Sequence, residues 1–165
     1  MKTFCTSIMT IVFLFACTLG IRAQTNGHKL DQIQLMQQVL GPWRLDVSAD
    51  TVELWESSVF DKAFVISVYQ VIRGVKTPLY FNNIGYDEAD DKFKAFALWP
   101  DGSSLTWIGA FTAEDILSID VVQDFNPEKI DFKLELMFES PVKMSFVYYT
   151  KYGEKTWVSN FYKVQ

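Results

Sequence analysis

The chain has 165 residues, of which 49% are hydrophobic and 16% aromatic, and it carries a formal net charge of −5. This acidic balance argues against DNA, RNA and anionic membrane surfaces as partners, because these require basic patches. Beyond the N-terminus, no apolar stretch approaches the roughly 20 residues that span a bilayer. We therefore expect no integral membrane segment in the mature chain.

The first residues have the composition of a secretion signal. Lys2 supplies a positive charge, an apolar stretch over residues 8–19 is too short to span a bilayer, and small residues follow. We predict a signal peptide at residues 1–23 and a secreted or periplasmic protein. An uncleaved anchor is one alternative. A lipid anchor at Cys17 is another, although Phe15 is bulky where lipoprotein signals have small residues.

Cleavage would leave a mature chain without cysteine. It removes Cys5 and Cys17 together with Lys2 and Arg22, which leaves 13 of the 15 basic residues against 20 acidic ones. A secreted domain without disulfides must be held by its core, and about 140 residues suffice for that. The polar residues 24–29 are expected to form a flexible leader before a single domain over residues 30–165.

A short amphipathic helix is predicted ahead of the first strand. Asp31 and Gln34 have the spacing of a capping box, and apolar residues then recur at helical intervals up to Leu40. Gly41-Pro42 ends the helix, since proline cannot continue it. The glutamines of the segment fall mostly on the other, polar side: Gln32, Gln34, Gln37 and Gln38.

The rest of the chain consists of roughly ten strand-like runs, rich in β-branched and aromatic residues. Short connections with turn-forming residues, such as Asn126-Pro127, force neighbouring runs to pair antiparallel. We predict an all-β fold, a single antiparallel meander barrel of eight to ten strands, because closure removes exposed edges. The runs cover residues 43–47, 51–57, 63–73, 77–86, 92–99, 104–112, 115–123, 129–138, 142–150 and 157–164.

Alternation of apolar and polar residues identifies an inner face in several runs. Small residues such as Ala95, Ala97 and Gly109 stand between large aromatic ones on this face, which leaves space for a ligand. The alternative is that they only relieve crowding where strands bend. On the first interpretation, Gly109→Phe would fill the cavity and abolish binding. The predicted ligand-binding residues are Phe93, Trp99, Trp107, Gly109, Phe132, Phe146 and Tyr148.

Three motifs carry a resemblance to a known family: Leu40-Gly41-Pro42-Trp43 after the helix, Ile84-Gly85-Tyr86-Asp87 followed by Lys92-Phe93, and the aromatic run at residues 157–162. Together they resemble secreted bacterial lipocalin-like proteins of the calycin class, a family largely unassigned in function. The resemblance implies a barrel closed at one end by the helix, with Trp43 over that end. It also implies a basic residue across Trp43, for which Lys163 is the candidate on the last run and Arg73 a more distant one.

The residues for most enzyme chemistry are missing. The one histidine, His28, lies in the leader, so neither a Ser-His-Asp triad nor a zinc cluster is predicted. We predict no catalytic residue, no metal site and no cofactor. Carboxylates alone can transfer protons, and Glu56 and Asp120 lie in strand-like runs. The acidic turn at residues 87–91 fits a solvated turn better than a calcium loop.

The leading prediction is non-covalent binding of a small apolar or amphipathic molecule inside the barrel. Polar residues such as Asn82 and Tyr148 would orient that ligand if they point inward. A second hypothesis is an interaction module with a filled barrel, which binds a protein partner or a second copy through run 63–73, apolar on both faces. A third is a carboxylate-dependent isomerase or hydrolase, which requires Glu56 or Asp120 to face inward.

Overall fold

The computed structural model describes residues 29–164. The predicted signal peptide at residues 1–23, the possible lipid anchor Cys17 and His28 of the leader lie outside the described residues. Within residues 29–164, no helix is long and apolar enough to cross a membrane.

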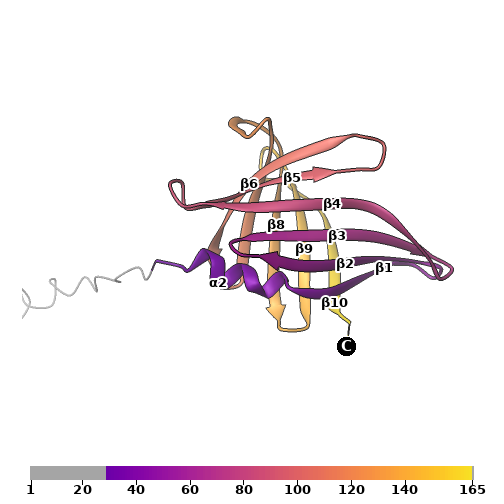
Figure 1. The fold of residues 1–165 in the computed structure, drawn as a ribbon. Helices are drawn as coiled ribbons and strands as arrows, with labels where there is room; N and C mark the ends of the chain where they lie inside the picture. Colours follow the sequence, from indigo (N-terminus) through magenta and orange to yellow (C-terminus); the bar gives the residue numbers. More distant parts are fainter. Residues whose placement is uncertain (1–28, 165) are drawn as a thin grey trace, which may run out of the picture.

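Ten antiparallel strands form one closed barrel, in which each strand pairs with its sequence neighbours and the last pairs with the first. This confirms the predicted all-β meander barrel. In Figure 1, strands β2 to β4 run crosswise to β8 to β10, and a short helix lies at one end. The strands are β1 (Gly41–Ser48), β2 (Thr51–Phe60), β3 (Ala63–Ile72), β4 (Val75–Asp87), β5 (Lys92–Leu98), β6 (Ser104–Ala113), β7 (Ile116–Gln123), β8 (Asn126–Ser140), β9 (Lys143–Thr150) and β10 (Lys155–Lys163).

One predicted turn lies two residues earlier than expected. Asn126 is already in β8 and pairs with Gln123, so the turn consists of Asp124 and Phe125. Both turn residues have positive φ, at 52° and 57°, as a two-residue hairpin requires. The prediction failed there because Phe125 is not a turn-forming residue, although Asp124 tolerates positive φ, and Asn126-Pro127 gave the stronger turn signal.

The predicted inner face is confirmed in most strands. Phe93, Ala95 and Ala97 of β5 are buried, as are Leu134 and Leu136 of β8. The outer side of β3, which the interaction-module hypothesis assigns to a partner, is half-buried. The helix contacts β6.

The helical segment comprises α2 (Gln32–Met36) and a 3-10 turn, η1 (Gln37–Val39). As predicted, Asp31 caps the helix and accepts a hydrogen bond from the Gln34 N–H at 3.0 Å. Met36 and Val39 are buried in the core.

Gln32 contradicts the prediction that the glutamines form the polar side, because it is buried against β6. Its side-chain amide donates to the Phe111 carbonyl at 3.1 Å and accepts from the Phe111 N–H at 2.7 Å. The pairing of β5 with β6 ends at Phe93 and Gly109, so β5 does not reach Phe111. The glutamine therefore takes the place of a neighbouring strand and fastens the helix to the barrel.

Trp43 lies at the seam where the barrel closes. Only two residue pairs join β1 to β10, Trp43 with Lys163 and Arg44 with Tyr162. The Trp43 indole is 1% exposed and donates to the Val39 carbonyl at 2.9 Å. The Lys163 Nζ lies 5.0 Å from the centre of the Trp43 ring, a cation–π contact.

Lys163 thus supplies the basic residue that the resemblance implies, whereas Arg73 pairs with Asp50 at 3.2 Å in a distant turn. Gly41 makes room for the Lys163 side chain. The φ of Gly41 is +100°, and a Cβ at this position would lie 2.9 Å from the Lys163 Cε. Because glycine has no Cβ, the lysine side chain can cross the seam between β1 and β10.

Replacement of Gln32 by leucine is expected to lower the free energy of unfolding by about 2–4 kcal/mol, because it leaves a buried N–H and a buried carbonyl of Phe111 unpaired. Gln37→Leu, at an exposed position of the same segment, is the matched control and should change it by less than about 0.5 kcal/mol. Urea unfolding of both variants measures the difference. Equal stability of the two would contradict the fastening role.

Candidate ligand-binding site

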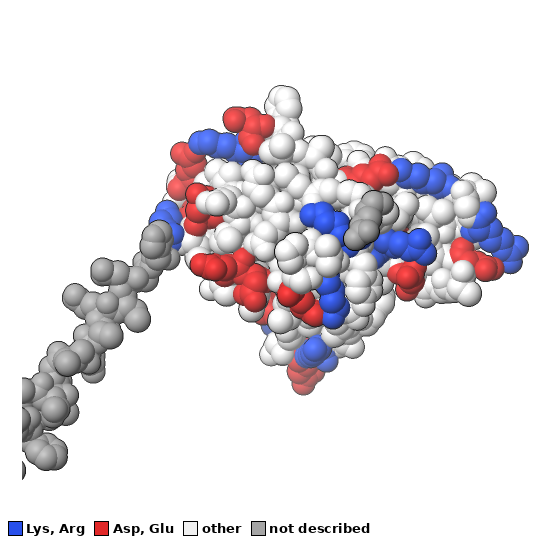
Figure 2. All heavy atoms as spheres, turned by 90° about the horizontal axis from the view of Figure 1, so that it is seen from below, with Lys and Arg blue, Asp and Glu red and all other residues white. Residues whose placement is uncertain are grey.

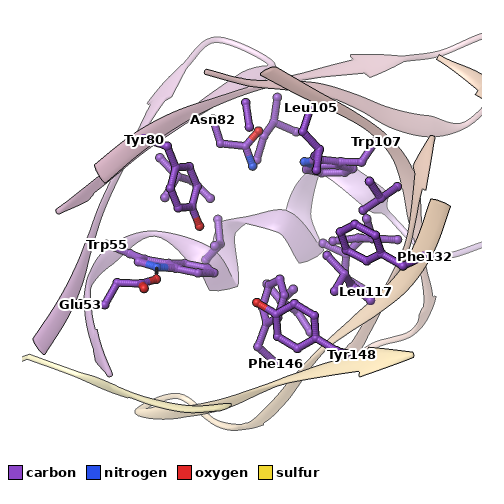
Figure 3. Close-up of a pocket in the computed structure, with 18 of the residues that line it drawn as sticks. Glu53, Trp55, Tyr80, Asn82, Leu105, Trp107, Leu117, Phe132, Phe146 and Tyr148 are labelled. Atoms are coloured by element: carbon purple, nitrogen blue, oxygen red, sulfur yellow. Dashed lines mark hydrogen bonds between the residues drawn. The ribbon is translucent and has the colours of Figure 1, made fainter. Parts of the chain in front are cut away.

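A cavity of about 240 Å³ lies inside the barrel. Met36 and Val39 of the helical segment line it from one end, and Figure 3 shows the helix behind the lining side chains. The eight strands from β2 to β9, together with Trp99 just after β5, supply the rest of the wall. The strand residues that line the cavity are Glu53, Trp55, Ile66, Tyr80, Asn82, Ile84, Ala97, Trp99, Leu105, Trp107, Leu117, Ile119, Val121, Phe132, Leu134, Leu136, Phe146 and Tyr148.

The structure brings most of the sequence-predicted site residues together. Trp99, Trp107, Phe132, Phe146 and Tyr148 all line the cavity. They come from three strands, β6, β8 and β9, and from the residue that follows β5.

Phe93 and Gly109, which were also predicted as ligand-binding residues, do not line the cavity. Phe93 is fully buried and packs against Phe64 and Tyr86, with ring centres 6.3 and 5.3 Å away. Gly109 lies where the next strand comes close: a Cβ there would be 2.7 Å from the Ser118 carbonyl oxygen. The glycine permits close strand contact, so Gly109→Phe would displace backbone rather than fill a cavity.

The sequence did not indicate three of the residues that line the cavity: Glu53, Trp55 and Tyr80. In β2, the face with Glu53 and Trp55 has fewer apolar residues than the face with Val52 and Leu54, so alternation predicts that Val52 and Leu54 face inward. The strand register instead places Glu53 and Trp55 on the inner face. Trp55 pairs directly with Trp43 across the β1–β2 hairpin, and paired residues lie on the same face of a sheet.

Glu53 is the only acidic residue among the described residues that line the cavity, and no lysine, arginine or histidine accompanies it. The Trp55 indole donates a hydrogen bond to its Oε1 at 2.6 Å. Burial raises the pKa of Glu53, and the Trp55 hydrogen bond opposes this only in part. The cavity therefore holds a carboxylate without a cationic partner.

Two tyrosine hydroxyls share the interior with Glu53. Burial raises the pKa of Tyr80 and of Tyr148, and the nearby Glu53 carboxylate raises both pKa values further. Both side chains therefore remain neutral at physiological pH and keep their O–H donors. In Figure 3 the Tyr80 and Tyr148 hydroxyls point into the cavity.

Asn82 contributes a buried acceptor. Its Oδ1 is inaccessible to solvent and has no hydrogen-bond partner within residues 29–164. A buried carbonyl oxygen without a partner costs about 1–3 kcal/mol.

The cavity is chemically two-sided. Figure 3 shows Glu53, Trp55 and Tyr80 on one side, with Trp107, Leu117 and Phe132 opposite. The first side carries a carboxylate and a hydroxyl, whereas the second offers hydrocarbon and an indole. This arrangement suits an amphipathic molecule better than a wholly apolar one.

Ring contacts hold the aromatic wall in place. Tyr80 stacks on Trp99 with ring centres 4.9 Å apart, and Phe146 lies 5.7 Å from Trp55 and 5.0 Å from Tyr148. Such contacts stabilise each pair by about 0.5–1.5 kcal/mol beyond its burial. The wall is therefore largely fixed before any ligand enters.

The carboxylates singled out from the sequence lie outside the barrel. Glu56 pairs with Lys76 at 2.6 Å, and Asp120 lies 3.5 Å from Lys133. Neither lines the cavity. The condition for the hydrolase or isomerase hypothesis, an inward Glu56 or Asp120, is therefore not met.

Surface charges are mostly paired. In the acidic turn, Lys94 binds Asp87 at 2.7 Å and Asp90 at 2.8 Å. Figure 2 shows acidic and basic side chains next to each other on one face. No group of three metal-ligating side chains occurs among residues 29–164.

The ten-strand closed barrel with one short helix is consistent with a lipocalin-like fold. Its interior has the features of a small-molecule pocket. No model of a known protein family matches the chain, and no curated protein matches it either.

Gly109→Ala is expected to destabilise the barrel by about 1–3 kcal/mol, because its Cβ would collide with the Ser118 carbonyl. Gly85→Ala is the control: its Cβ would have only an ordinary contact at 3.9 Å, and alanine is favoured over glycine there by up to about 1 kcal/mol. Thermal unfolding should separate the two variants in opposite directions. An unchanged melting temperature for Gly109→Ala would show instead that β7 shifts easily to accommodate the added Cβ.

Glu53→Gln is expected to stabilise the ligand-free protein at neutral pH. Because burial raises its folded-state pKa, Glu53 favours folding below its unfolded pKa and loses that contribution as the pH rises through the folded pKa. The facing titratable groups, Tyr80 and Tyr148, stay neutral throughout. The difference in the free energy of unfolding between the Glu53→Gln variant and the wild type should therefore shrink towards zero below about pH 4.

Urea unfolding between acidic and neutral pH measures this difference. Glu56→Gln is the matched control on the outer face, where loss of the Lys76 pair should change stability by less than about 1 kcal/mol. A Glu53→Gln variant that is less stable than the wild type at neutral pH would contradict the unpaired state of the carboxylate.

Proposed function

We propose that this protein binds a small apolar or amphipathic molecule non-covalently inside its barrel. The observation that carries the proposal is the cavity of about 240 Å³, with apolar walls and a few convergent polar groups. Small-molecule sites generally combine these two features.

The size of the cavity limits the ligand. An engineered protein cavity of about 150 Å³ accepts benzene. A cavity of about 240 Å³ therefore suits a molecule of one or two rings, and is small for a long acyl chain or a tetrapyrrole. Burial of each side-chain-sized apolar group would contribute roughly 1.5–3 kcal/mol to binding.

The binding function is favoured over the two alternatives. An interaction module with a filled barrel would have no such cavity, although Phe81 and Phe96 on neighbouring strands are 41% and 38% exposed. A carboxylate enzyme was expected to use Glu56 or Asp120, which lie outside. A secreted or periplasmic location is supported by the N-terminal pattern of residues 1–23.

Ala97→Leu tests the proposal, because Ala97 lines the cavity and a larger side chain would occupy its space. We expect affinity for the uncharged fluorescent probe 2-naphthol, which has two rings, to fall by about tenfold or more, a loss of about 1.4 kcal/mol. Ala110→Leu is the matched control. Ala110 lies on the outer face of β6, between the inward Gly109 and Phe111, so its replacement should leave binding unchanged.

Thermal unfolding verifies that both variants fold, and native mass spectrometry of the wild type detects any molecule carried from the cell. Failure of the wild type to bind the probe or carry a molecule would contradict the proposal. So would equal binding by a folded Ala97→Leu variant.

A further inference from the structure

The Glu53 carboxylate has no cationic partner in the cavity. The Trp55 indole is the one donor to this carboxylate among residues 29–164. No basic side chain lies among the described lining residues. A partly buried carboxylate with a single neutral donor lacks the compensation that charges in a protein interior normally have.

Aromatic rings surround this carboxylate. Trp55 is hydrogen-bonded to it, and Figure 3 shows Tyr80 on the same side, with the Tyr148 hydroxyl directed into the space between them. The electron-rich faces of such rings attract cations, most strongly where water is excluded. A carboxylate beside three aromatic rings is therefore a suitable environment for an organic cation.

Other classes of ligand fit this environment less well. An anionic ligand would be repelled by Glu53 in a medium of low dielectric constant. A purely apolar ligand would bury Glu53 further without giving it a donor. A ligand with a positively charged N–H group supplies both a compensating charge and a donor to the carboxylate.

We propose that the ligand of this cavity is a small amine, with its ammonium group against Glu53 among Trp55, Tyr80 and Tyr148. Its apolar part, of one or two rings, lies towards Trp107, Leu117 and Phe132 on the opposite side. This inference rests on the proposed binding function and adds the chemical class of the ligand.

Three probes of nearly equal size test the inference by titration calorimetry near neutral pH: 2-phenylethylamine, 2-phenylethanol and 3-phenylpropionate. They share a phenyl ring and a two-carbon chain and differ in being cationic, neutral and anionic. We expect the wild type to bind the amine about tenfold or more tightly than the alcohol, and to bind the carboxylate most weakly.

Glu53→Gln keeps the acceptor for the Trp55 indole and removes the charge. We expect this variant to lose the preference for the amine, with affinities for the amine and the alcohol within about threefold of each other. Glu56→Gln, which removes the same charge from the outer face, is expected to keep the wild-type preference. Unfolding in urea verifies that both variants are folded.

The outcomes separate this inference from the function on which it rests. Binding of the alcohol as tightly as the amine, or a preference that survives in Glu53→Gln, would overturn the amine class but leave a working cavity. Absence of binding for all three probes and for 2-naphthol would overturn the binding function itself.

Discussion

Closure of the barrel is the constraint on which the rest of the structure depends. Closure gives every strand a paired neighbour on both sides. The closing seam between β1 and β10, however, has only two residue pairs. Trp43 and Lys163 reinforce that seam by their cation–π contact, and Gly41 leaves the space that the lysine needs. Once the ring of strands is closed, alternation decides which side chains face the interior. The helix then covers one end, fastened by Gln32.

The fold could be predicted because its signals are local. Each strand contains β-branched and aromatic residues between short turns, and short turns allow only antiparallel neighbours. The failures occurred where the deciding contact is distant in sequence. Gln32 follows the polar pattern of its helix but is buried against Phe111, 79 residues away. Asp124 and Phe125 adopt positive φ because the flanking strands require this conformation. The conformational preference of Phe125 does not indicate it.

The candidate site could be predicted only in part, because alternation gives the face of a strand but not the depth along it. Trp107 and Gly109 share the inner face of β6, yet only Trp107 lines the cavity, since β7 approaches Gly109 too closely. Glu53 was missed for another reason. Its face of β2 has few apolar residues, and only the register that pairs Trp55 with Trp43 places it inside.

Glu53 also connects the stability of the barrel to its proposed function. A carboxylate in this interior opposes folding at neutral pH, since burial favours its protonated form. The same carboxylate would attract an ammonium ion, whose charge replaces the solvation lost on burial. A neutral side chain would give a more stable but less selective barrel. The destabilisation of the empty protein is therefore what allows an amine to stabilise the complex, and glutamine at position 53 should move stability and amine affinity in opposite directions.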